Sequence, residues 1–303
     1  MSWILLGLMG CGDQLEPDAW NPQEAEMVGD EVAQPVVLAS GLDGPKGLAW
    51  WQEQLFVAEE DGGRVVSIEE GEVWVDDLSG PTWLAAEGDW LMIADSAAGA
   101  IELLGSDGSR RTLSEGHASI GRIALVNGQA WWLDPDAGEL WSADTTDGSG
   151  YLVAESLDDP VGLSVLDGVP WVAEQESELL TEVDPETGES STVAELEDPP
   201  HDLVREGDAA FLTSRSTRWP YGGFILSVHD DEVEELSYSP PEPERIGLTE
   251  DHVIWSSKQS ITRVDRSGGT YELVSGMTAV EDFISLEGVI MWTDGQTGEI
   301  LSW

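Results

Sequence analysis

Residues 289–302 (VIMWTDGQTGEILS) and residues 129–142 (QAWWLDPDAGELWS) share one pattern. Each begins with a short apolar strand that ends in an aspartate, continues through a turn that contains a glycine, and ends in a second apolar strand. Two apolar strands joined by a short polar turn are typical of an antiparallel hairpin. The two stretches therefore indicate a repeated β unit.

The pattern recurs along the chain. Four short strands follow one another every ~40 residues, with turn signals between them and no helical periodicity. Because one four-stranded blade leaves two apolar faces that only its neighbours can cover, this period predicts an all-β fold with a single β-propeller. The 15 tryptophans fit such a fold, since large flat side chains fill the space between blades. A β-sandwich is the alternative. Seven segments begin near Pro45, Pro81, Ser119, Pro160, Pro200, Arg245 and Ala279.

The last segment ends at Trp303 after only three strands. Residues 36–39 (VVLA) follow a polar N-terminal stretch and can supply the missing strand. Pairing both chain ends in one blade would close the ring and remove an exposed edge. We therefore predict seven four-stranded blades over residues 34–303, closed by an N-terminal strand.

Two groups of motifs resemble known propeller repeats. Residues 131–134 (WWLD) and 291–294 (MWTD) resemble the Tyr-Trp-Thr-Asp repeat of the YWTD propellers. Residues 92–101 (MIADSAAGAI) resemble an NHL or virginiamycin-lyase-type repeat. The resemblance spans residues 34–303 and implies the fold, while a shared fold implies little about activity. YWTD and NHL rings usually have six blades, so six is the alternative to our count of seven.

The charge is strongly one-sided, with 61 acids, 12 bases and a net charge of −49. Such a charge repels phosphate backbones and excludes nucleic acid as an expected partner. Acids spread over every segment indicate a solvated surface that resists self-association, so we expect a monomer. The composition also fits adaptation to a salty habitat, where ions screen this repulsion.

The N-terminus predicts a lipid anchor. Residues 8–11 (LMGC) follow an apolar run and resemble the lipobox of bacterial lipoproteins, in which the cysteine is lipidated after cleavage. The resemblance implies a signal peptide over residues 1–10 and a lipidated Cys11. Residues 11–33 are acidic and contain two prolines, as expected of a flexible tether. The predicted location is the Gram-negative cell envelope, with the domain tied to a membrane by its lipid. A buried segment with an inert thiol is the alternative.

Sequence signatures of several enzyme classes are missing, including G-x-S-x-G, H-E-x-x-H and a glycine-rich phosphate loop. Gluconolactonase-like propellers bind a divalent metal through Glu, Asn and Asp, but the two asparagines here, Asn21 and Asn127, are not expected to reach a channel. Virginiamycin-lyase-like enzymes use histidine and acids on the top face, where His201 could lie. For each of the four histidines, a satisfied surface position is the preferred interpretation. No cofactor is expected, although Asp134 and Asp136 could belong to a calcium loop instead of a plain turn.

Basic residues gather on one predicted surface. The top face of a propeller is built from the loops between blades and the loops after each second strand. Residues 214–223 (SRSTRWPYGG) form a longer loop there, with the arginine and aromatic side chains that are enriched in binding hot spots. An ordinary insertion is the alternative interpretation of this loop. The candidate ligand-binding residues are Lys46, Arg122, His201, Arg215, Arg218, Trp219, Tyr221, Arg245 and Lys258.

Two functions are compatible with these features. The first is an envelope-anchored, non-enzymatic binding or scaffolding lipoprotein that uses its top-face loops. The second is a metal-assisted propeller hydrolase or lyase, of the gluconolactonase-like or virginiamycin-lyase-like kind. The missing catalytic motifs favour the first. The ligand could be a protein, a glycan or a small molecule.

Overall fold

A computed structural model describes residues 34–216, 222–239, 242–249, 251–265 and 270–303. Residues Pro35–Trp303 form one compact unit. Cys11 and the predicted signal peptide and tether lie outside the described residues, as do Arg218, Trp219 and Tyr221. Within the described part of the chain, no helix is long and apolar enough to cross a membrane.

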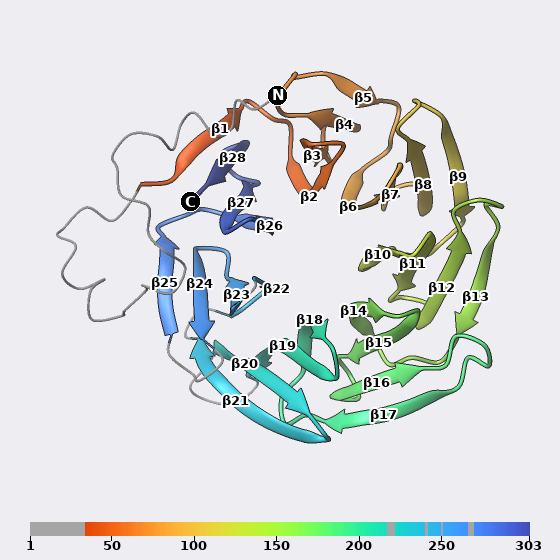
Figure 1. The fold of residues 1–303 in the computed structure, drawn as a ribbon, viewed down its shortest axis with the longest axis vertical. Helices are drawn as coiled ribbons and strands as arrows, with labels where there is room; N and C mark the ends of the chain where they lie inside the picture. Colours follow the sequence, from red (N-terminus) through yellow and green to blue (C-terminus); the bar gives the residue numbers. More distant parts are fainter. Residues whose placement is uncertain (1–33, 217–221, 240–241, 250, 266–269) are drawn as a thin grey trace. The chain divides into compact units, whose positions relative to one another are not determined.

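The described strands form seven antiparallel sheets of four strands each, arranged as blades around a centre (Figure 1). Both the propeller and the count of seven are thus confirmed, and the six-blade alternative is wrong. Blade 1 contains β2 (Pro45–Trp51), β3 (Gln54–Glu59), β4 (Arg64–Ser67) and β5 (Val73–Val75). Blade 2 contains β6 (Pro81–Glu87), β7 (Trp90–Asp95), β8 (Ala100–Gly105) and β9 (Arg110–Glu115). Blade 3 contains β10 (Ile123–Val126), β11 (Gln129–Asp134), β12 (Glu139–Asp144) and β13 (Gly150–Ala154). Blade 4 contains β14 (Pro160–Leu166), β15 (Val169–Glu174), β16 (Leu179–Val183) and β17 (Ser190–Glu195).

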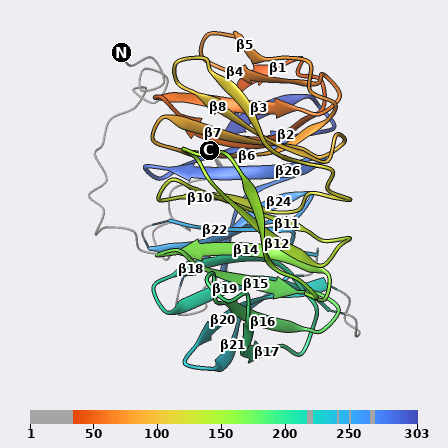
Figure 2. The same ribbon diagram turned by 90° about the vertical axis from the view of Figure 1, so that its right-hand side faces the viewer.

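The remaining blades follow the same order. Blade 5 contains β18 (Pro200–Glu206), β19 (Ala209–Ser216), β20 (Gly222–His229) and β21 (Glu232–Ser239). Blade 6 contains β22 (Arg245–Leu248), β23 (His252–Ser256), β24 (Ser260–Asp265) and β25 (Thr270–Ser275). Blade 7 contains β26 (Val280–Leu286), β27 (Val289–Asp294), β28 (Glu299–Ser302) and β1 (Val36–Ser40). In Figure 2 the ring is seen edge-on, and strands such as β14 and β26 run across its thickness, so each strand ends at one of the two faces.

Blade 7 joins the two ends of the propeller. β1 pairs antiparallel with β28, with Val36 opposite Ser302 and Ser40 opposite Glu299 (Figure 1). The loop after β1 is fixed as well, because the Leu42 amide donates to the carbonyl of Gly298 at 3.0 Å. The predicted closure by an N-terminal strand is confirmed.

The core lies between the blades. Seven apolar clusters occupy the seven interfaces, and each draws side chains from two adjacent blades. Between blades 2 and 3, Trp132 is fully buried and stacks on Trp141 with ring centroids 6.3 Å apart. Replacing a buried tryptophan of this kind by alanine typically costs about 3–5 kcal/mol. The stability of each blade therefore depends on its neighbours.

The turn after each second strand forms hydrogen bonds with the loops that connect neighbouring blades. In blade 2, Asp95 ends β7 and its carboxylate accepts hydrogen bonds from the amides of Ser79 and Gly80, both at 2.8 Å. These amides belong to the loop that enters the blade. Four residues later, Gly99 accepts a hydrogen bond from the amide of His117, in the loop that leaves it. A side chain at Gly99 would be excluded, because its φ is +61° and a Cβ would lie 2.3 Å from the His117 carbonyl oxygen.

The same arrangement recurs in most blades. A buried carboxylate at the end of the second strand accepts at least one amide hydrogen bond from the entering loop. In blades 5 and 6 this position holds Ser214 and Ser256, whose buried hydroxyls have no hydrogen-bond partner among the described residues. We call the five buried carboxylates at this position in the other blades the acidic latch. They belong to Glu59, Asp95, Asp134, Glu174 and Asp294.

The segment predicted over residues 214–223 is longer than its equivalents, but most of its extra length is paired strand. β19 and β20 pair out to Ser216 and Gly222, so only residues 217–221 are left between them. Gly223 permits this pairing, because a Cβ there would lie 2.0 Å from the carbonyl oxygen of Ser214. The feature is an extended hairpin with a short tip.

Removing residues 1–41 should expose the edge of β28 and destabilise the propeller. The variant loses all of β1 and the Leu42 contact is weakened, so we expect the melting temperature to fall by at least about 5 °C, a loss of a few kcal/mol for a domain of this size. A variant that lacks residues 1–30 keeps every described strand and is the control. Equal melting temperatures for the two truncations would show that β1 does not stabilise the ring.

Candidate site at the channel mouth

Charged side chains converge at one end of the central channel, where the innermost strand of each blade begins and the second strand ends. We call this end the channel mouth. Arg122 lies just before β10, and its guanidinium forms a two-pronged ion pair with Asp202 of β18, with Nε donating to Oδ1 at 2.8 Å. Asp202 is fully buried and also accepts from the amide of Ile246 at 3.1 Å. One carboxylate thus ties together blades 3, 5 and 6.

Asp202 stays charged in this position. Burial opposes the charge, but Arg122 and then Arg245 outweigh it and lower the pKa of Asp202. Burial also opposes the charge of Arg122, and attraction to Asp202 reverses the effect and raises the pKa of Arg122. The pair is therefore an ion pair at neutral pH, with its desolvation offset by good geometry.

Arg245 lies at the start of β22, at the same end of the channel. The Cζ atoms of Arg122 and Arg245 lie 4.5 Å and 4.2 Å from the ring centroid of Trp83, so both guanidinium groups contact this indole. Contact with an aromatic face stabilises a cation, by about 2 kcal/mol or more in a desolvated place. Burial, followed by repulsion from Arg122, lowers the pKa of Arg245.

The hydrogen bonds of Arg245 leave part of its guanidinium open. Its Nε donates to the carbonyl oxygen of Glu281 at 3.2 Å. Within the described residues, the two terminal nitrogens donate to no protein group, and no carboxylate lies within 4.0 Å of them. Arg245 is one of the side chains that line a recess of about 240 Å³ at the mouth.

Acidic side chains also line the recess. The ammonium of Lys46 lies 3.0 Å from a carboxylate oxygen of Glu281 and 3.5 Å from one of Glu60. Burial opposes the charge of Lys46, but these two carboxylates outweigh it and raise its pKa. Asp282 is buried and accepts from the amide of Leu48 at 3.0 Å. Burial raises the pKa of Asp282 despite the two nearby arginines.

His201 and Arg215 form a second group at the mouth. A terminal nitrogen of Arg215 donates to Nε2 of His201 at 2.9 Å, which assigns the ring proton to Nδ1. Burial, with repulsion from Arg215 and Arg245, lowers the pKa of His201 to about 3. The imidazole is neutral at pH 7, and its one lone pair is already used. His201 is therefore a poor general base. Because it is not an imidazolium at this pH, it cannot act as a charged general acid either.

The alternation of side chains along β18 is broken at this point. On a regular strand His201 and Asp202 would point to opposite faces. A register shift between Pro200 and Asp202 interrupts the pairing with β19, and similar shifts occur at the start of β2, β6, β14 and β26. Such bulges re-aim side chains, and here they turn both residues of blade 5 towards the mouth.

Among the sequence candidates, the structure brings Lys46, Arg122, His201, Arg215 and Arg245 together at the mouth. Lys258 lies at its rim, 3.8 Å from Glu244, which also lies 4.0 Å from Arg215. The acidic and aromatic partners that organise these bases were not among the sequence candidates. They are Glu60, Trp83, Asp202, Glu281 and Asp282.

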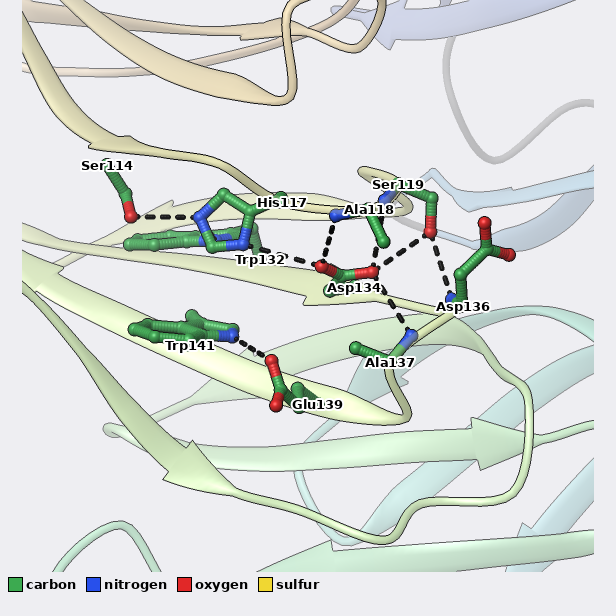
Figure 3. Close-up of polar contacts among 10 residues, drawn as sticks. All are labelled: Ser114, His117, Ala118, Ser119, Trp132, Asp134, Asp136, Ala137, Glu139 and Trp141. Carbon is green, nitrogen blue, oxygen red and sulfur yellow. Dashed lines mark hydrogen bonds and ion pairs between the residues drawn. The ribbon is translucent and has the colours of Figure 1, made fainter.

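A second histidine cluster lies between blades 2 and 3 (Figure 3). Ser114 Oγ lies 2.8 Å from Nε2 of His117, and Nδ1 of His117 lies 3.5 Å from Asp134. The order of groups is that of a catalytic triad, but Trp132 Nε1 also donates to Nε2 at 3.1 Å and occupies the lone pair that a base would use. A Cβ at Gly150 would lie 3.1 Å from Ser114 Oγ, so blade 3 packs against the hydroxyl. The cluster holds two blades together.

His117 corrects one expectation. Its side chain is 4% exposed, so the preferred surface position is wrong for this histidine. Burial lowers its pKa in spite of attraction from Asp134, and the ring packs edge-on against Trp132 and Trp141.

The proposed calcium loop is occupied by other contacts. Asp134 accepts from the amides of Ala118, Ser119 and Ala137 (Figure 3). The amide of Asp136 donates to Ser119 Oγ at 2.9 Å. In the described ranges, no group of three or more His, Cys, Asp or Glu residues is arranged to hold a metal ion.

Solved structures match this arrangement of blades at low identity. Virginiamycin B lyase from Staphylococcus aureus superposes with a TM-score of 0.74 and 15% identity, over 89% of this chain and 97% of that one. The chain shares the seven-bladed fold of that lyase. Hydrazine synthase from Kuenenia stuttgartiensis gives a TM-score of 0.72 at 12% identity, over 91% of this chain and 99% of that one. A gluconolactonase from Xanthomonas campestris gives 0.55 at 18% identity, over 77% and 90%. No protein-family model and no curated protein sequence matches the chain.

Protonation of His201 should cost stability in acid. Its folded-state pKa of about 3 lies below the ordinary value of 6.5, so the unfolded chain binds the proton more readily. Stability should therefore fall as the pH drops from 6.5 towards 3, by at most about 5 kcal/mol from this group. H201Q keeps an acceptor for Arg215 and removes the titration. Urea unfolding of both proteins at pH 7 and near pH 4 measures the difference, because the carboxylates are common to both. An identical pH dependence would contradict a buried neutral His201.

Proposed function

We propose that this protein is a non-enzymatic binding module whose ligand enters the channel mouth. The observation that carries the proposal is the open hydrogen-bonding edge of Arg245. A recessed guanidinium that contacts Trp83 and the Glu281 carbonyl, but has no carboxylate within 4.0 Å, is prepared to receive an acceptor group from a ligand.

The size of the recess favours a small molecule. Its volume of about 240 Å³ lies below the ~300–1,000 Å³ of pockets for drug-sized ligands. A larger recess of about 510 Å³ lies at the opposite end of the strands, beside Thr249 and Gly288. It is lined by residues of blades 6 and 7, whereas the mouth combines charges from blades 1, 3, 5, 6 and 7.

The chemistry of the mouth argues against the enzymatic alternative. One matched structure is a catalytically inactive histidine-to-alanine variant of virginiamycin B lyase with quinupristin. The histidine at the mouth of this chain, His201, is neutral and its lone pair is bonded to Arg215. A neutral imidazole whose lone pair is already bonded is a poor proton acceptor, which favours binding over hydrolysis or elimination.

Binding at the mouth predicts a ligand that co-purifies and is not consumed. Small molecules released from the wild-type protein on denaturation should be absent from R245A and W83A, and should be recovered chemically unchanged after long incubation. R205A is the matched control, since Arg205 also stacks on a tryptophan, Trp171, at the far end of β18. Mass spectrometry of the released fraction gives the result. Conversion of the ligand, or equal cargo on wild type and R245A, would contradict the proposal.

The module is held in the cell envelope by a lipid on Cys11. This part of the proposal rests on the lipobox-like residues 8–11 and on the acidic stretch that follows. Several acyl groups anchor a protein firmly, so wild type should remain with membranes through salt and carbonate washes. C11S should appear in the soluble fraction by immunoblotting. Retention of C11S in the washed membranes would refute the lipid anchor.

A further inference from the structure

We infer that the recess at the channel mouth takes a small zwitterion of the α-amino acid type, with its carboxylate on Arg245 and its ammonium beside Glu281 and Glu60. The inference rests on the proposed function and adds the chemical class of the ligand. It follows from the way in which positive and negative groups divide the walls of one recess.

Arg245 provides the carboxylate end. A guanidinium presents a planar fork of N–H donors that matches both oxygens of a carboxylate. Its Nε is already used by the carbonyl of Glu281, which leaves the terminal nitrogens for the ligand. Contact with Trp83 fixes the plane of the fork, so little conformational entropy is lost when the ligand binds.

Glu281 links the two ends of the recess. Its main-chain carbonyl contacts Arg245, while its carboxylate lies 3.0 Å from the ammonium of Lys46. Glu281 thus contacts the cationic group and also supplies an anionic group, and both groups line one small recess. An α-amino acid carries a carboxylate and an ammonium within one small molecule. Glu60 also borders the acidic end and is partly exposed, so it can contact an incoming ammonium.

The balance of charge selects against other anions. The recess contains two cations, Lys46 and Arg245, and three carboxylates, Glu60, Glu281 and Asp282. Lys46 is already paired with two of these carboxylates. A phosphate or sulfate dianion would meet uncompensated negative charge, while a simple amine would leave the fork of Arg245 unused. A zwitterion satisfies both ends.

Calorimetry with matched probes tests the inference. L-Alanine, propionate and ethylamine differ only in which charged end they carry, and L-leucine and inorganic phosphate test size and charge. We expect the amino acids to bind at least about tenfold more tightly than propionate, ethylamine or phosphate, which corresponds to one lost charge-assisted contact. Comparable affinity for propionate and L-alanine, or tight binding of phosphate, would overturn the inference that the ligand is a zwitterion.

Two variants separate the ends of the ligand. R245K keeps the charge but loses the fork, and should weaken L-alanine and propionate alike by about tenfold. E281Q removes the partner of the ammonium, so it should weaken L-alanine but leave propionate unchanged or bound more tightly. R205A is again the control for an arginine stacked on tryptophan. Loss of both probes in E281Q, or of neither in R245K, would contradict the assignment.

The calorimetric result can be told apart from the result of the co-purification experiment. A co-purifying ligand that depends on Arg245 but is not a zwitterion would refute this inference and leave the proposed function intact. Far-ultraviolet circular dichroism of each variant verifies that the propeller is folded. If R245A does not fold, the conservative variant R245K measures the contribution of Arg245 to binding in its place.

Discussion

The propeller depends on a buried carboxylate at the end of the second strand of most blades. In blade 3, Asp134 holds the entering loop through the amides of Ala118 and Ser119, while Gly138 accepts from Leu157 in the leaving loop. Each hydrogen bond to a charged group is worth about 1.5–3 kcal/mol. Because one turn fixes both connections, the angle between successive blades is set locally in the five blades that carry this carboxylate.

The arrangement of strands was predictable because the period and the turn chemistry repeat along the chain. The acid and glycine of residues 134–138 and 294–298 mark the same turn in different blades, and residues 36–39 complete a blade that has only three strands at its C-terminal end. Blades 5 and 6 carry Ser214 and Ser256 where the others carry an acid, so the motif alone does not identify them. Short apolar runs at residues 210–213 and 253–255 indicate their second strands instead.

The channel mouth was only partly predictable. The bases stood out because the chain has 12 of them, but Asp202 and Asp282 are two acids among 61 and carry no distinguishing signal. Their burial follows from register shifts at the start of the innermost strands, where side-chain alternation fails. Trp83 is one tryptophan among 15 in the sequence, although its ring is the platform for two arginines. Contacts between blades 2, 3 and 6 depend on the closed ring and are not encoded within any one repeat.

The pairing of β1 with β28 also has a consequence for biogenesis. The first strand of the propeller to be synthesised has its partner at the last positions of the chain, Val36 opposite Ser302. Until residue 302 is available, blade 7 has an open edge and β1 has no hydrogen-bonding neighbour. Contacts between residues so distant in sequence are slow to form, because the loop-closure entropy is lost before any stabilising contact is gained. Completion of the ring is therefore a late event that follows synthesis of residue 302, and shorter nascent chains present an edge that other strands can pair with.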